Sequence, residues 1–91
     1  MTDDQIKTIR DAAASLRGAA AFLRAGRESS GIRNIRWAGE KIAEAHLDGP
    51  CSDGTTMIAA AIKAYGQGND NTAASHADTA AARLTALVPA A

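Results

Sequence analysis

The sequence has few of the residues that usually carry a chemical function. It contains one cysteine, Cys51, so no internal disulfide can form, which is typical of a protein from a reducing compartment. Only three of its 91 residues are aromatic, and these are Phe22, Trp37 and Tyr65. Ten basic and ten acidic residues balance, so net charge gives no reason to expect nucleic acid or an acidic membrane as a partner.

Longer patterns are missing as well. No apolar run reaches the roughly 18 residues of a membrane span, and no charged start followed by an apolar segment marks a signal peptide. No run of alternating β-branched residues predicts a strand. We therefore expect a single cytoplasmic helical domain over residues 1–91, with no membrane partner. The high alanine content suggests a bacterial protein, and the small size would also fit a phage protein.

The sequence does contain a strong helical pattern, which is clearest between Thr2 and Ala25. Apolar residues recur there at steps of three and four, and they are Ile6, Ile9, Ala13, Leu16, Ala20 and Leu23. Thr2 and Gln5 have the spacing of a capping box, which would start the helix. A helix of roughly 22 residues would be about 33 Å long, and its narrow apolar stripe requires other helices to cover it.

Three further helices are predicted over residues 31–48, 52–65 and 70–88. Ser29 or Ser30 would cap the first of them, and Gly49 would occupy its C′ position. Four amphipathic helices with short connections predict an all-α four-helix bundle with an up-down-up-down antiparallel topology and a long first helix. The unequal helix lengths leave open an irregular bundle or an exchange of helices between two copies.

The apolar stripe of the second predicted helix contains two unusual residues. The stripe consists of Ile32, Ile35, Gly39, Ile42 and His46. A mid-helix glycine costs roughly 1 kcal/mol relative to alanine, so we expect a neighbouring helix to approach closely at Gly39. The position of His46 near the helix end suggests an interaction with the last carbonyl groups rather than a chemical role.

A local excess of arginine is the first candidate binding feature. Six arginines and only two acidic residues lie between residues 10 and 36, and the arginines are Arg10, Arg17, Arg24, Arg27, Arg33 and Arg36. The planar guanidinium group suits carboxylate and phosphate, so this basic patch could dock an acidic protein or a nucleic acid. The simpler interpretation, which we favour, is a solvated face balanced by Asp53, Asp70 and Asp78.

The aromatic residues are the second candidate. At 100° per residue, Phe22 and Trp37 both fall away from the apolar stripes of their helices. They are equally distant from the predicted turn at Ser29 and Ser30, so they would lie at one level of a helical hairpin. Exposed aromatic residues among charges are typical of interaction hot spots, while the alternative is that the later helices cover one of them.

Chemistry at Cys51 or His46 is the weakest hypothesis. Cys51 comes just before a predicted helix start, where the helix dipole could lower its pKa, and His46 lies five residues earlier. No orienting acid, metal-ligand spacing or phosphate-binding loop accompanies them. We expect no enzyme activity, no cofactor and no metal site.

The sequence therefore favours a small non-enzymatic interaction module, an adaptor or inhibitor, that docks through the hairpin of the first two helices. Its partner would be another protein, for which an acidic surface would suit, and homodimerisation is an open alternative. A nucleic-acid-associated regulator using the arginines is less favoured, and a Cys/His catalyst is weaker still. The predicted partner-binding residues are Phe22, Trp37, Arg33, Arg36, Arg17, Arg24 and Arg27.

Overall fold

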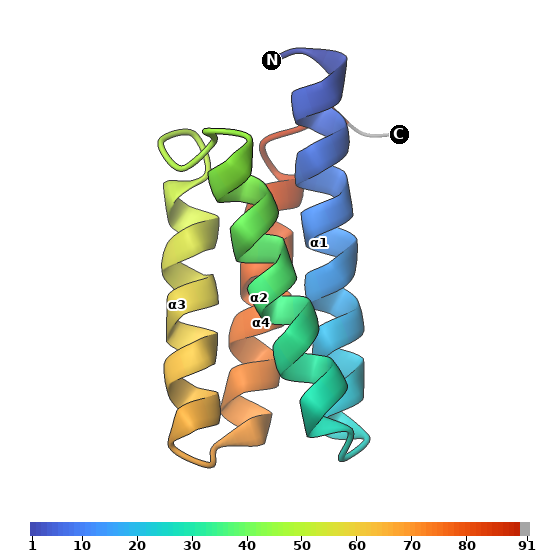
Figure 1. Ribbon diagram of the computed structural model, residues 1–91, viewed down its shortest axis with the longest axis vertical. Helices are drawn as coiled ribbons and strands as arrows, with labels where there is room; N and C mark the ends of the chain where they lie inside the picture. Colours follow the sequence, from blue (N-terminus) through green and yellow to red (C-terminus); the bar gives the residue numbers. More distant parts are fainter. Residues whose placement is uncertain (90–91) are drawn as a thin grey trace.

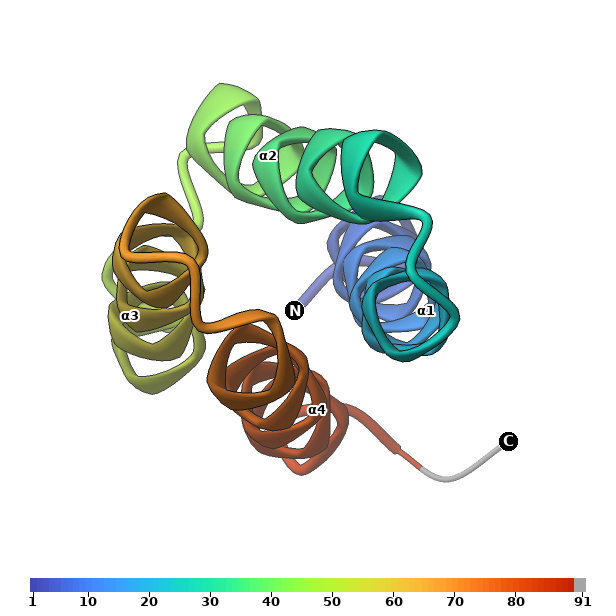
Figure 2. The same cartoon turned by 90° about the horizontal axis from the view of Figure 1, so that it is seen from below.

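The computed structural model describes residues 1–89 and contains, within that range, four α-helices and no strand. The helices are α1 (Asp3–Arg24), α2 (Glu28–Glu44), α3 (Ser52–Gly66) and α4 (Asp70–Thr85). They run alternately down and up (Figure 1), and α4 packs against α1 to close the bundle (Figure 2). The predicted all-α, up-down-up-down four-helix bundle with a long first helix is confirmed. Residues 90 and 91 of the predicted domain lie outside the described range.

Helix α1 begins where its capping residues predict. The Gln5 N–H donates to the Thr2 hydroxyl at 3.2 Å, and the Thr2 N–H donates to the Gln5 side chain at 2.8 Å, so the capping box is confirmed. The predicted stripe is buried from Ile9 to Leu23, and only Ile6 is partly exposed. No helix within residues 1–89 is long and apolar enough to cross a membrane.

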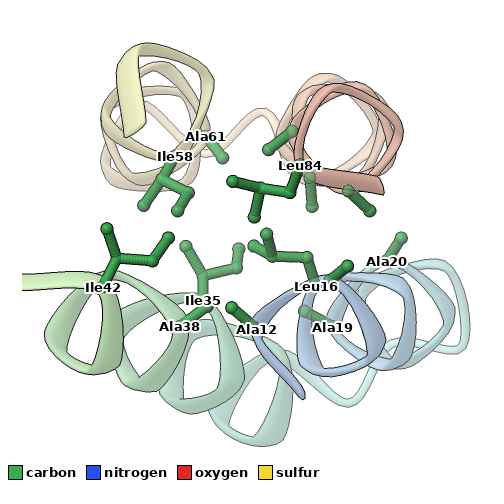
Figure 3. Close-up of a cluster of buried hydrophobic side chains, with 14 of the residues drawn as sticks. Ala12, Leu16, Ala19, Ala20, Ile35, Ala38, Ile42, Ile58, Ala61 and Leu84 are labelled. Carbon is green, nitrogen blue, oxygen red and sulfur yellow. The ribbon is translucent and has the colours of Figure 1, made fainter. Parts of the chain in front are cut away.

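The core is built mainly from alanine, with a few large side chains at its centre. Leu16 of α1, Ile35 of α2 and Leu84 of α4 point toward one another there, and none of them has exposed surface (Figure 3). The alanines buried around them are Ala12, Ala13, Ala19, Ala20, Ala38, Ala61, Ala64, Ala73, Ala74, Ala77, Ala80 and Ala81. Because alanine buries little area, each large side chain contributes a large share of the hydrophobic stabilisation.

The turn between α1 and α2 is tighter than the sequence indicates. Gly26 has a φ of 78°, and Arg27 after it completes a Schellman C-cap, so α1 ends abruptly. As a result α2 begins at Glu28, three residues earlier than predicted. Ser29 and Ser30 lie inside the helix, and the prediction that one of them caps it is wrong.

The other end of α2 also differs from the prediction. His46 follows the helix with a φ of 56°, a left-handed conformation that glycine usually adopts at this position. The Leu47 N–H donates to the Ile42 carbonyl at 3.0 Å, and the Leu47 side chain is buried in the core. Burial of Leu47 therefore sets the helix end, and the predicted continuation through residue 48, with Gly49 as the C′ residue, is wrong.

The left-handed cap leads to a testable prediction. Replacing His46 with glycine is expected to raise the free energy of unfolding by about 0.5–1 kcal/mol, because glycine adopts this conformation without the steric cost of a Cβ atom. Urea denaturation would measure the change. Gly26→Ala provides the matched control, since the same conformation at Gly26 makes a loss of stability the expected result there. A less stable His46→Gly variant would contradict this account of the cap.

Close helix contacts occur at glycines other than the one predicted. A Cβ atom built at Gly39 would lie 3.5 Å from Ile58, which is ordinary van der Waals contact, so the expected close approach at Gly39 is wrong. A Cβ atom at Gly31 would instead lie 2.7 Å from Leu23, and one at Gly54 would lie 2.6 Å from Leu84. These two glycines allow α1 to pack against α2 and α3 against α4.

Candidate functional site

The outer side of α2 carries a shallow depression with a volume of about 390 Å³. Its lining residues recur every three or four positions, so they lie on one side of the helix. They are Ser29, Ile32, Arg33, Arg36, Trp37 and Glu40, and together they are called the α2 face. Three of the predicted partner-binding residues, Arg33, Arg36 and Trp37, are therefore brought together.

Trp37 is the most exposed aromatic side chain of the described residues, with 38% of its surface accessible. Its exposure agrees with its position opposite the apolar stripe. The Lys41 ammonium group lies 5.6 Å from the ring centroid, within the range of a cation–π contact, so one charge already flanks the ring. Ile32 is partly buried beside the depression, although the sequence pattern assigned it to the core stripe.

The two arginines of the α2 face project into solvent. Arg33 and Arg36 are exposed, and neither forms an ion pair with any carboxylate within residues 1–89. Glu40 is also exposed and likewise unpaired over that range. The face thus combines an apolar ring, two free guanidinium groups and one free carboxylate.

Phe22 lies away from this face. The Ser15 hydroxyl donates to the Asn34 carbonyl at 3.0 Å, so these two residues lie at the same level. Because α1 and α2 run in opposite directions, Trp37 lies level with residues of α1 that come before Ser15. Phe22 is seven residues beyond Ser15 in the other direction, so the two residues are separated by roughly 10–15 Å along the bundle. The expectation that they share one level is wrong, because the turn is centred on Gly26 rather than on the two serines.

The predicted basic patch is divided between two sides of the molecule. Three arginines of α1, seven residues apart, reach across to α4 and the chain beyond it. Arg10 donates to the Pro89 carbonyl at 2.6 Å and Arg17 donates to the Thr85 hydroxyl at 2.8 Å. Arg24 forms an ion pair with Asp78 at 2.7 Å, so one of the predicted balancing carboxylates is found in place. These three arginines therefore lie along the α1–α4 side of the bundle, away from the α2 face.

Acidic residues also lie beside the arginines at the end of the bundle that contains the α1–α2 turn. The Arg27 guanidinium lies 5.2 Å from the centre of the partly buried Phe22 ring. Next to it, Glu28 begins α2, and its carboxyl interacts with Asp70 at the start of α4. A hydrogen bond with Asp70, followed by repulsion between the two carboxyls, raises the pKa of Glu28. This end therefore offers no continuous positive surface.

Neither Cys51 nor His46 has the surroundings of a catalytic or metal-binding residue in the part of the chain that the structure describes. Cys51 has no exposed surface, and burial, followed by the charge of Asp48, raises the pKa of its thiol, so the expected lowering of that pKa is wrong. A buried, protonated thiol is a poor nucleophile. His46 is exposed beyond the end of α2. Residues 1–89 contain no group of three or more potential metal ligands.

The predicted partner-binding residues did not include three members of the α2 face, Ser29, Ile32 and Glu40. The positions of Ser29 and Glu40 were a usable signal, since both lie within about 80° of Trp37 at 100° per residue. Ile32 lies about 140° from Trp37, so its membership could not be found in this way. The predicted helix start, three residues too late, also placed Ser29 in the turn instead of on the helix.

Comparison with known proteins finds no relative. No family model, no curated protein and no solved structure matches this chain.

Proposed function

We propose that this chain is a small non-enzymatic protein-interaction module, an adaptor or inhibitor, that docks other proteins through the α2 face. The observation that carries the proposal is the exposed Trp37 in a shallow depression beside Arg33 and Arg36, two guanidinium groups that pair with no carboxylate of residues 1–89. Tryptophan and arginine are the residues most enriched among interface hot spots. A matching protein would insert an apolar side chain beside the ring and present carboxylates to the arginines.

A nucleic-acid partner is the less favoured alternative. Arg10, Arg17 and Arg24 contact α4 or the chain after it, and only the remaining arginines are free to meet a phosphate backbone. Salt separates the two alternatives, because release of counterions from phosphate contacts makes affinity fall steeply with salt concentration. A docking surface centred on Trp37 should respond less to salt, since its core contact is apolar.

Substitution of Trp37 tests the proposal. The unmodified chain is first used to capture a binding protein from an extract of the source cells. Trp37→Ala is expected to weaken association with that protein by roughly 30-fold, which corresponds to a hot-spot loss of about 2 kcal/mol. Its free energy of unfolding should change by no more than about 1 kcal/mol, because the side chain lies on the surface. Association is measured with the immobilised protein in an extract of the source cells, and stability by urea denaturation.

Leu87→Ala is the matched control for this test. Leu87 is 39% exposed, about as much as Trp37, but it follows α4 and lies outside the α2 face. Association should survive its removal. A large loss of stability in Trp37→Ala without a change in association would place the ring in a structural role and would contradict the proposal.

A further inference from the structure

The charges on the α2 face are divided along the helix. Arg33 and Arg36 lie toward its N-terminal half, and Glu40 lies toward its C-terminal half. Arg33 and Glu40 are seven residues apart, so they project from the same side at a separation of roughly 10 Å along the axis. Within one chain that separation is too long for an ion pair, which agrees with both groups being unpaired in residues 1–89.

This order of charges is self-complementary. If two α2 helices pack antiparallel about a two-fold axis between Arg36 and Trp37, each Arg33 faces the Glu40 of the other copy. The same axis places each Arg36 against the Trp37 ring of the other copy, where a guanidinium group can stack. A two-fold interface must use one surface patch on both subunits, and the α2 face meets that requirement.

Contacts within the chain compete weakly with this arrangement. Arg36 and Glu40 are one turn apart, but they form no ion pair in the structure. An arginine placed before a glutamate is also the less favourable order for such a pair. The carboxylate of Glu40 is therefore available to a second molecule.

A dimer interface of standard size would cover only part of this small chain. The described chain has an accessible surface of 5008 Å², and a standard interface buries about 800 Å² on each partner. That is about a sixth of the accessible surface of the described chain.

We propose that a second copy of this chain occupies the α2 face, packed antiparallel so that Arg33 of each copy pairs with Glu40 of the other and Trp37 is buried between them. This inference rests on the proposed function and takes the protein that the α2 face docks to be a second copy, which any other protein would have to displace. It accounts for the apolar ring, for the free positive charges and for the free negative charge with a single interaction.

Charge reversal provides the test. Sedimentation velocity over a range of concentrations should show that the unmodified chain forms dimers, while R33E and E40R each weaken dimerisation at least tenfold through like-charge repulsion. A 1:1 mixture of R33E and E40R should dimerise again, because both contacts then join opposite charges. The double variant R33E/E40R should regain dimerisation for the same reason. Both sites are exposed, so the variants should fold, and circular dichroism checks this.

Tryptophan fluorescence gives an independent measurement, since Trp37 is the only tryptophan in the chain. Its emission should shift to shorter wavelength with rising concentration in the unmodified chain and not in R33E alone. Single variants that dimerise normally, or a mixture that stays monomeric while both folds are intact, would overturn the inference. An unmodified chain that remains monomeric would also overturn it. The proposed function would then still stand if Trp37→Ala, but not Leu87→Ala, lost association with another protein.

Discussion

Replacing Leu16 with alanine is expected to lower the free energy of unfolding by about 2–5 kcal/mol, measured by urea denaturation. Leu16 has no exposed surface and points to the centre of the bundle, toward Ile35 and Leu84 (Figure 3). The cost combines the lost transfer of the side chain from water with the cavity that remains. The neighbouring side chains are mostly alanines, which are too short to move in and fill that cavity.

The size of this effect matters because small domains are stable by only about 5–15 kcal/mol. A loss near the upper end of the expected range would equal the whole stability of a domain at the low end of that scale. Leu87→Ala is again the appropriate control, since it removes the same atoms from an exposed position and should change stability by no more than about 0.5 kcal/mol. If the two substitutions had equal effects, Leu16 would not belong to the core.

Addition of a single methyl group at Gly54 is expected to destabilise the protein by about 1–3 kcal/mol, although alanine favours helices over glycine. The new Cβ atom would lie 2.6 Å from Cδ2 and 2.8 Å from Cγ of Leu84. Leu84 is completely buried, so it cannot turn outward to relieve the overlap. Gly54→Ala must therefore shift α3 away from α4 or force Leu84 out of its preferred rotamer.

Gly39→Ala makes the same chemical change where there is space. A Cβ atom there would lie 3.5 Å from Ile58, so the gain in helix propensity should dominate and stabilise the protein by about 0.5–1 kcal/mol. Opposite signs for the two substitutions are the expected outcome of thermal and urea unfolding. A stabilising Gly54→Ala would show that the contact with Leu84 yields easily and is not a constraint on helix packing.

The candidate surface was only partly predictable from sequence. The exposure of Trp37 follows from helical periodicity alone, because the ring lies opposite the residues that α2 buries. Its separation from Phe22 does not, since the level of each ring depends on where the turn is centred. The partners of Arg10, Arg17 and Arg24 lie more than fifty residues away along the chain, so no local pattern indicated that these side chains bridge to α4.

Local properties of the sequence determined the number of helices, the start of α1 at its capping box and the buried stripe from Ile9 to Leu23. Each depends on residues within a few positions of one another, where backbone hydrogen bonding and the 3.6-residue period act directly. The tertiary structure alone decided that α2 ends at a left-handed His46, because burial of Leu47 outweighs the preference for glycine. It also decided that Gly31 and Gly54, rather than Gly39, are the points of close packing, because the separation of two helices is set by side chains on both.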